Sequence, residues 1–474
     1  MAVVLIFSQG SGNNAQYQNI YSLAYSFPDT RDAYMMQTDA LAKGQIYLDI
    51  EPSEELLALE NPYDLSQRDG IDYIWDFAFY NGKYYSYFGI IPVILFLLPF
   101  RLITGMYFSS FFFSFFMEMG AIFSLAFFYR AFVQRFFKNC NAFIFTFGLI
   151  AVLFGSNILF LSSRSWFYEI AYASGLMFTF LSLTMLIKIH PDKPHCFRYT
   201  FLAALFFALS VGCRPNYCIY FIIHIPILMY LLKTTEQKNI RLKMIAFYAV
   251  PVIVTGCFIG LFNFMRFGSF FQFGAIYQLT VSDISQNNLF DFGKIQEGLL
   301  RYFLQPIGFD TKFPFVFLSK YEFTSAASDM YSNPVVGLIC YPVIWNIIFL
   351  PFVIYHSIIK KKSDKNSPVI SFIIGIIGMI ICSVIMVVAV TASAGIMERY
   401  TTDFRWILTA AAVFTFFCFI NCIDNYKSKK MLIINRIAKI WFCISVVCSS
   451  YFCFGIGTVG EFSRITFFLP FLFG

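Results

Sequence analysis

Residues 368–392 read PVISFIIGIIGMIICSVIMVVAVTA, a run without a single charged side chain. A helix of about 20 apolar residues crosses the hydrocarbon core of a bilayer, so this run predicts a membrane-spanning helix. Four lysines precede the run within residues 360–365, whereas Glu398 and Arg399 follow it. The two ends of this helix therefore differ in charge, and that difference predicts an orientation in the membrane.

Further apolar runs extend outward from this one in both directions. They lie at 108–128, 141–161, 169–189, 199–213, 216–232, 244–264, 334–358, 405–423 and 437–456. Run 199–213 is short for a span. Of all 474 residues, 58% are hydrophobic and 13% charged, which excludes a soluble enzyme, a disordered chain and a disulfide-stapled secreted domain. The sequence predicts an all-α polytopic membrane protein.

Every second connection between the apolar runs is basic. Segments 130–140, 188–198, 233–243, 360–365 and 424–439 hold 19 lysines and arginines against four acids. By the positive-inside rule these five are cytoplasmic, so 1–87, 265–333 and 394–404 lie outside. Residues 2–7 (AVVLIF) are too few to span and are interpreted as the stub of a first helix, although a chain that starts outside is the alternative.

The segments divide the chain into four parts. We predict a first outer loop at 1–87, a juxtamembrane piece with transmembrane helices at 88–264, a second outer loop at 265–333 and further transmembrane helices at 334–474. The basic residues fall in short clusters and not in one patch, which argues against nucleic acid as a partner.

The outer segments contain few residue types suited to strong chemistry. None of the 12 cysteines lies in 1–87 or 265–333, and no CxxC pair offers a zinc or redox site. All four histidines fall in the membrane or on its cytoplasmic side in this topology. Carboxylates are therefore the leading candidates for an acid or base outside.

The first outer loop begins with an acidic helix start. Asp29, Thr30 and Asp32 precede a helix that we expect to run to Lys43 and to stop at Gly44. One interpretation makes Asp29 or Thr30 the cap and lets Asp32 complement the helix dipole. The other makes Asp32 or Asp29 a catalytic carboxylate. A second short helix is predicted from Ser53 to a point before Pro62.

Asn81-Gly82 is a strong signal for a type I′ hairpin turn. Pairing about this turn puts on one face Asp76, Ala78, Tyr80, Lys83, Tyr85 and Tyr87. A carboxylate among tyrosines could hold a sugar through ring stacking and hydrogen bonds, but an aromatic hairpin at the membrane interface is an equal alternative. Residues 88–103 are predicted to form an interfacial or re-entrant piece.

Six arginines, and no lysine with them, stand at the outer ends of apolar runs. They are Arg101, Arg164, Arg214, Arg266, Arg399 and Arg405. Arginine presents a planar fork that matches phosphate oxygens, so the set suggests recognition of an anionic group. The alternative is snorkelling to headgroups and pairing with Glu169, Glu398 or Asp403. Glu169 itself begins a helix at the outer side, where a simple dipole role is also open.

Several of these segments resemble the GT-C superfamily of polytopic glycosyltransferases, near the protein mannosyltransferase and aminoarabinose transferase group (glycosyltransferase family 39-like). Asp32-Ala33-Tyr34 with the helix ending at Gly44 looks like the acidic start of their first outer loop. GKYYSYFGIIPVILFLLPF (82–100) is similar to their tyrosine- and proline-bearing stretch. NFMRFGS (263–269) and Glu398-Arg399-Tyr400 resemble two later elements. The usual paired Asp-Glu is absent.

The resemblance implies a GT-C-like bundle of about 10–11 transmembrane helices with a mixed α/β first outer loop. It implies transfer of a sugar from a polyprenyl-phosphate-linked donor to an envelope glycan, lipid or protein acceptor on the outer face of the cytoplasmic membrane, without an obligatory cofactor. A lipid-linked polysaccharide polymerase or ligase is the alternative, and a transporter or flippase is a weaker one.

The resemblance and the residue types together suggest roles for individual side chains. Asp32 is the first choice for the base and Asp29 the second. Sugar, acceptor and phosphate contacts are expected from Asp76, Lys83, Tyr85, Tyr87, Glu169, Arg266, Arg399, Tyr400 and Arg405, with Arg399 the leading phosphate ligand.

Overall fold

A computed structural model describes residues 31–138, 140–162, 166–281, 283–286, 291–325, 330–360, 368–424 and 428–458, and the two-residue strand β1 at Ala24–Tyr25. Asp29, Thr30, Arg164 and the apolar residues 2–7 lie outside the described residues.

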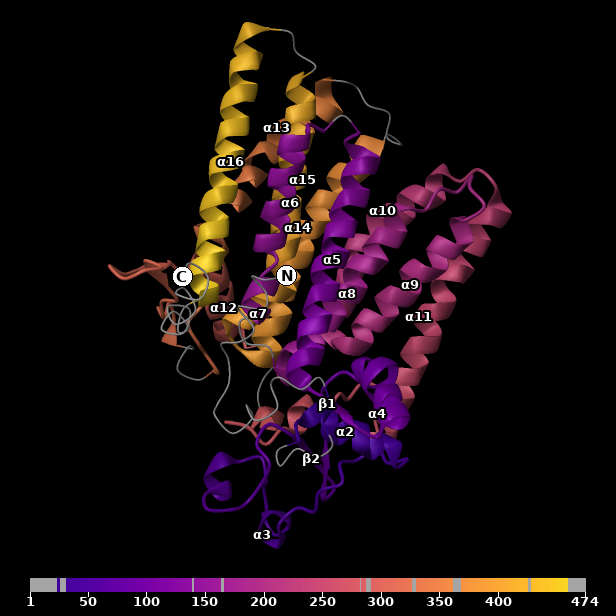
Figure 1. Ribbon diagram of the computed structural model, residues 1–474, viewed down its shortest axis with the longest axis vertical. Helices are drawn as coiled ribbons and strands as arrows, with labels where there is room; N and C mark the ends of the chain where they lie inside the picture. The colour runs from indigo at the N-terminus through magenta and orange to yellow at the C-terminus, as the bar shows by residue number, and fades with distance from the viewer. Residues whose placement is uncertain are drawn as a thin grey trace, which may run out of the picture.

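The chain is mostly helical (Figure 1). Among the described residues, eight helices are long and apolar enough to cross a membrane, and they support a multi-pass membrane protein. These helices are α5 (Ser110–Phe136), α8 (Phe167–Ile187), α9 (Cys196–Cys213), η4 with α10 (Pro215–Tyr220, Phe221–Thr234), α11 (Lys238–Phe267), α14 (Pro368–Ala394), α15 (Arg405–Asp424) and α16 (Lys429–Thr458). The prefix η denotes short 3-10 or π helices. The doubtful run 199–213 is one of the eight, as the last part of α9.

Two of the ten predicted spans are irregular. Run 141–161 forms α6 (Ala142–Gly155) and α7 (Ile158–Ser162), because Asn157 has a positive φ of 63° that breaks the helix. Run 334–358 contains η8 (Leu338–Cys340), η9 (Pro342–Phe349), α13 (Leu350–Ile354) and η10 (Tyr355–Lys360). Each of these two runs has a continuous apolar helix of only 10–17 residues, so length alone does not establish it as a span.

The bundle is built around α15. In its most apolar stretch, 89% of the residues of this helix are buried. It packs against α6, α14, α16 and η9. A second row follows in the order α5, α8, α9 and α11, and α11 at the edge is only 11% buried. The exposed surface of α11 is apolar, as expected for a helix that is surrounded by lipid.

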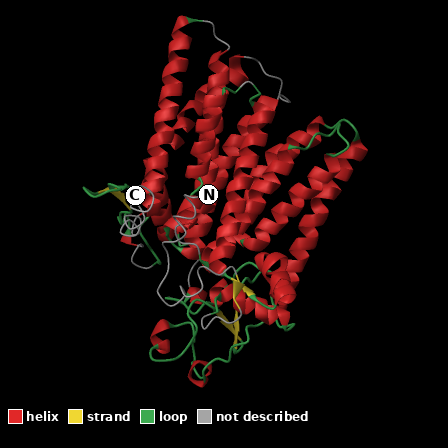
Figure 2. Cartoon of the chain, in the orientation of Figure 1, coloured by secondary structure: helices red, strands yellow, loops and turns green. Residues whose placement is uncertain are grey.

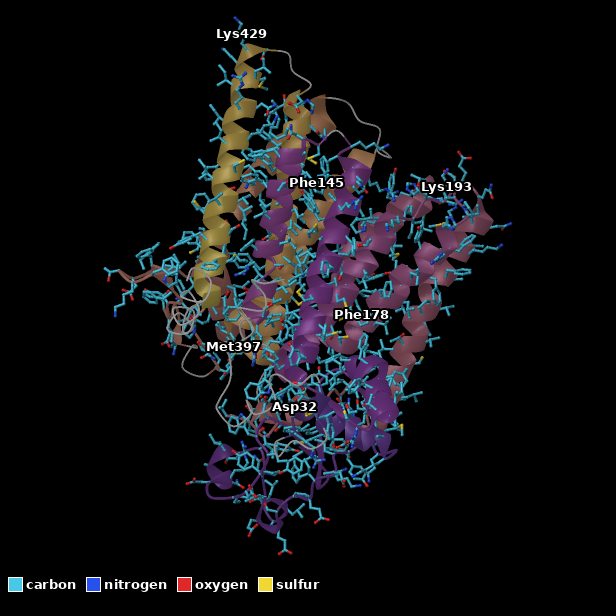
Figure 3. All side chains as sticks on the ribbon, in the orientation of Figure 1. Asp32, Phe145, Phe178, Lys193, Met397 and Lys429 are labelled. Atoms are coloured by element: carbon cyan, nitrogen blue, oxygen red, sulfur yellow. The ribbon has the colours of Figure 1, made fainter. Side chains whose placement is uncertain are left out.

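The polar segments collect at one end of the bundle. Figure 3 shows Asp32 at this end, and Lys193 and Lys429 at the other. We name them the loop end and the basic end. Helix pairs that flank a basic connection, such as α8 with α9 and α10 with α11, meet at the basic end (Figure 1). The alternation predicted from charge is thus present in the structure, while which end faces the cytoplasm remains a prediction.

Short elements make up the loop end. They are α2 (Ala33–Ala42), α3 (Glu54–Leu57), η2 (Leu65–Arg68), β2 (Ala78–Tyr80), β3 (Lys83–Tyr85), η3 (Val93–Leu97), α4 (Leu98–Thr104), β4 (Tyr107–Phe108), η5 (Ala275–Tyr277), η6 (Ile284–Gln286), α12 (Phe292–Leu304), β5 (Gly308–Phe309), β6 (Val316–Phe317) and η11 (Glu398–Asp403). Figure 2 shows how few of the described residues are strands. The described part of the first loop contains short helices and the β2–β3 hairpin, which agrees with the expected mixture of α and β structure. Residues 93–104 form a short apolar helix, and their interfacial or re-entrant position stays a prediction.

The hairpin register is as predicted. Ala78 pairs with Tyr85 and Tyr80 with Lys83, around a turn in which Asn81 and Gly82 have φ of 49° and 70°. The second loop attaches to this hairpin: the Asp76 N–H donates to the Leu279 carbonyl at 2.9 Å, and the Leu279 N–H donates to the Phe77 carbonyl at 3.0 Å. The two polar segments therefore form one joint structure.

Candidate functional site

The first-choice base, Asp32, is the N-cap of α2. Its Oδ1 accepts hydrogen bonds from the N–H groups of Tyr34 and Met35 at 3.0 and 3.1 Å, and its side chain is buried. The expectation that Asp29 or Thr30 caps this helix is wrong, because the helix begins at Ala33 and the extended backbone of Asp32 points the carboxylate at the free N–H groups. Burial raises the pKa of Asp32, although the hydrogen bonds from Ser110 and from these N–H groups act to lower it. The capping contacts favour a structural role.

Asp76 has a different environment. It precedes β2 and holds a positive φ of 65°, which is uncommon for a residue other than glycine. Its Oδ2 accepts hydrogen bonds from the Tyr168 hydroxyl at 2.6 Å and from the Tyr87 hydroxyl at 3.2 Å. Burial raises the pKa of Asp76, and these two hydrogen bonds and the charge of Arg399 oppose that rise. A carboxylate in such surroundings is a candidate for accepting and returning a proton.

Arg399 lies on the other side of Tyr168. Its Cζ stands 4.7 Å from the centre of the Tyr168 ring and 5.6 Å from that of Tyr400. Its Nη1 is 3.8 Å from Oε1 of Glu169, a long ion pair, and its Nε is buried without a hydrogen-bond partner in the described part of the chain. The side chain is 21% exposed, so the guanidinium keeps donors for a further acceptor.

We name this group the Tyr168 cluster: Asp76, Tyr87, Tyr168, Glu169, Arg399 and Tyr400. One tyrosine connects its two charged sides, since the Tyr168 hydroxyl binds Asp76 and its ring lies under Arg399. The members come from the residues before β2 and after β3, from the first turn of α8, and from η11. The cluster offers a carboxylate, a guanidinium and phenol hydroxyl groups together.

A second charged pair adjoins the cluster. Arg214 binds Asp403 through Nε at 3.1 and 3.0 Å and through Nη2 at 2.6 Å, and the Tyr217 hydroxyl donates to the same carboxylate at 3.1 Å. The Arg214 guanidinium lies 3.9 Å from the ring of Tyr172, which in turn stacks on Tyr400 at 6.4 Å. This pair fixes η11 against the start of η4.

Arg405 lies elsewhere. Its guanidinium is 2% exposed and donates to Tyr341 at 2.7 Å, to Glu398 at 3.2 Å, to the Gly155 carbonyl at 3.3 Å and to the Asn157 side chain. Having these partners, it is not available for a phosphate as the sequence suggested, and pairing with Glu398 was the stated alternative. Sequence alone did not reveal that Arg405 faces into the bundle.

Arg266 is also held by protein partners. Its Nη1 donates to the Ser86 carbonyl at 2.6 Å and its Nη2 to the Asn263 side chain at 2.7 Å, which ties α11 to the end of the hairpin. It shares no described contact with Arg399. The element 263–269 therefore acts here as a bracket between a membrane helix and the first loop.

The rest of the predicted hairpin face is covered by other rings. Tyr85 and Tyr80 pack on Phe267 at 5.2 and 5.8 Å, and Nζ of Lys83 stands 3.7 Å above the Tyr47 ring. Only the Asp76–Tyr87 end of that face joins the cluster. Lys83 is exposed and Tyr85 is buried, and no hydrogen bond or ion pair among the described residues joins either of them to Arg399 or Asp76.

Sequence reasoning missed Tyr168 and Tyr172 as neighbours of the site, whereas pairing of an outer arginine with Asp403 was the stated alternative and is the contact that Arg214 makes. Tyr168 stands beside the predicted Glu169, and Arg214 was recognised as an outer arginine, but no spacing rule joins these positions to Asp76. Comparison of the chain with protein-family models, with curated proteins and with solved structures finds no match.

Proposed function

We propose that the chain is a glycosyltransferase of the GT-C kind, which moves a sugar from a polyprenyl-phosphate donor to an acceptor at the loop end of the bundle. The proposal rests on one observation: Tyr168 holds a partly buried carboxylate, Asp76, beside the guanidinium of Arg399, whose Nε has no hydrogen-bond partner among the described residues. A carboxylate and a cation at a membrane surface are the groups that this reaction needs.

In the proposed reaction an acceptor hydroxyl attacks C1 of the donor sugar. Asp76 takes the hydroxyl proton, the new bond forms between the acceptor oxygen and C1, and the bond from C1 to the phosphate oxygen breaks. The phosphate leaves with the bonding electrons, and Arg399 neutralises the charge that it gains. Tyr87 donates a hydrogen bond to Asp76, and its own pKa is raised by burial and by the Asp76 charge, so it stays protonated.

The proposed base is thus Asp76 and not Asp32. Burial raises the pKa of both carboxyl groups. Asp32, however, accepts hydrogen bonds from two backbone N–H groups in the first turn of the helix, where the helix itself supplies no carbonyl partner. Among the described residues, the Asp76 carboxylate accepts hydrogen bonds only from phenol hydroxyl groups, which can exchange these bonds for those of a sugar.

The test is transfer by purified protein in lipid with labelled polyprenyl-phosphate sugars and candidate acceptors. The proposal expects release of free polyprenyl monophosphate that depends on acceptor. Release of a polyprenyl diphosphate from a diphosphate-linked oligosaccharide would instead identify the polymerase or ligase. Movement of the intact sugar lipid across the bilayer without bond cleavage would identify a transporter.

A further inference from the structure

A cavity lies within the bundle near its basic end, on the side away from the Tyr168 cluster. It measures about 70 Å³ and is enclosed by α5, α8, α10 and α14, with one residue of α15. Its walls are apolar apart from Arg135 and Tyr230, and they are formed by Phe128, Phe132, Phe136, Leu183, Ile187, Ile223, Pro226, Ile227, Leu231, Phe372, Gly375, Ile376, Met379 and Phe414.

The helix backbone of α14 is open toward this space. A Cβ built on Gly375 meets no atom within 4 Å, and one on Gly378 meets only ordinary contacts at 3.6 and 3.7 Å. Water is disfavoured in such a cavity because the walls offer almost no hydrogen-bond partners. A hydrocarbon chain from the surrounding membrane has the right chemistry to fill it.

Arg135 stands where the cavity meets the basic end. Its Nη1 donates to the carbonyls of Ile187, which lines the cavity, and of Ile189, at the end of α8. Its Nε and Nη2 have no hydrogen-bond partner among the described residues, and no described carboxylate pairs with it. Burial lowers the pKa of nearby His190, and the positive charges of Arg135 and Lys193 lower it further, with Asp192 opposing.

We propose that this cavity binds one acyl chain of an anionic phospholipid from the leaflet at the basic end, with the lipid phosphate on Arg135. The charge at the margin selects the headgroup, because a guanidinium fork pairs with phosphate oxygens and basic groups between helices attract anionic lipids. The apolar walls take the start of the chain. This site is separate from the Tyr168 cluster and does not depend on the proposed function.

The experiment measures thermal unfolding of the purified full chain in detergent with added phosphatidylglycerol or phosphatidylcholine of identical acyl chains. Phosphatidylglycerol should raise Tm by about 2–4 °C more than phosphatidylcholine. Gly375→Leu fills the cavity and Arg135→Gln removes the charge, so each should abolish that difference.

Matched controls exist for both changes. Gly256→Leu also adds a side chain to a membrane helix at a glycine with nothing within 4 Å, but α11 lies away from the cavity. Arg130→Gln removes an exposed arginine from the same helix as Arg135. Both controls should keep the headgroup difference. An equal response to the two lipids, or a difference that survives both Gly375→Leu and Arg135→Gln, would overturn the proposal.

A second measurement needs no variant. Phosphatidylglycerol with a photoreactive group near the start of one acyl chain should label the unaltered protein within residues 223–231 or 372–379, which line the cavity. Labelling confined to outward-facing positions of α11, such as 250–261, shows ordinary boundary lipid and contradicts the proposal.

Discussion

Asp76 combines an uncommon backbone conformation with a partly buried carboxylate. Its φ of 65° is held by the backbone hydrogen bond to Leu279 of the second polar segment. Residues held in this way cluster at functional sites, where the surrounding structure compensates for the strain. Asparagine tolerates the same conformation and keeps an acceptor for the two tyrosines, so it is the informative substitution.

Asp76→Asn should lower sugar transfer by about 100- to 10,000-fold, since the side chain can no longer accept a proton. Asp32→Asn is the matched control: asparagine caps a helix nearly as well, so the free energy of unfolding should fall by only a few tenths of a kcal/mol, with transfer retained. Single-turnover rates on folded protein measure both. If Asp32→Asn loses transfer activity while Asp76→Asn retains it, Asp32 is the base and the assignment to Asp76 is wrong.

The raised pKa of Asp76 also predicts the pH dependence of transfer. The carboxylate must be deprotonated to act as a base, and burial lifts its pKa above the ordinary 3.8. Activity should therefore fall on acidification at a pH clearly above 3.8, and kcat/KM as a function of pH measures that midpoint. The residual activity of Asp76→Asn should lack this acidic limb, and an unchanged limb in that variant would assign it to another group.

Arg399 supplies the third residue-scale prediction. Arg399→Lys keeps the charge but loses the planar fork, so KM for the lipid donor should rise. Arg399→Ala should raise it further and also lower kcat if the contact strengthens as the phosphate leaves. Kinetics on purified, folded variants measure both. Normal donor KM and kcat in Arg399→Ala, together with a lower Tm, would make Arg399 a structural partner of Glu169.

At the scale of elements, η11 is held in place by hydrogen bonds from Asn157, between α6 and α7, and by the contacts of Glu398. Asn157 donates through Nδ2 to the Glu398 carbonyl and to the hydroxyls of Thr401 and Thr402, at 3.1, 2.7 and 3.2 Å. Glu398 accepts from the Val336 N–H at 3.0 Å and pairs with Arg405. The break in α6 at Asn157 thus serves to fix the turn that carries Arg399.

Arg405→Ala should accordingly destabilise the protein and not act selectively on the donor. Removing one partner of a buried ion pair leaves Glu398 uncompensated, at a cost of about 3–5 kcal/mol. Thermal unfolding in detergent should show a lower Tm, while the folded fraction retains near-normal donor KM. A normal Tm with a raised donor KM would instead place Arg405 in the phosphate site.

At the scale of the whole molecule, the charge of the connections predicts orientation. Phe271, which is 90% exposed at the loop end, should as cysteine react with an impermeant thiol reagent in intact cells, or in spheroplasts if an outer membrane shields it. Lys238→Cys, at the start of α11 and the basic end, should stay unlabelled until the cells are opened. Labelling is measured relative to the unsubstituted chain, which has cysteines of its own. The reverse pattern would show that the orientation in the membrane is opposite to the predicted one.

The sequence alone determined the features that depend on neighbouring residues. Apolar length and alternating charge predicted the helices and their alternation, because the bilayer imposes one length on every span and cations resist transfer. The Asn81-Gly82 turn and the register of its hairpin followed from local backbone preference. Residue type also marked Asp76, Glu169, Arg399 and Tyr400 as members of a polar site.

Only the tertiary structure decided which of these residues meet. Tyr168 joins Asp76 to Arg399 across three segments far apart in the chain, and no periodicity encodes that contact. Asp32 and Arg405 have residue types that are common in active sites. In the fold, Asp32 instead caps the start of α2, and Arg405 pairs with the buried Glu398. Burial and pairing arise from packing between helices, so a charged side chain's partner is fixed by the fold and not by its sequence neighbours.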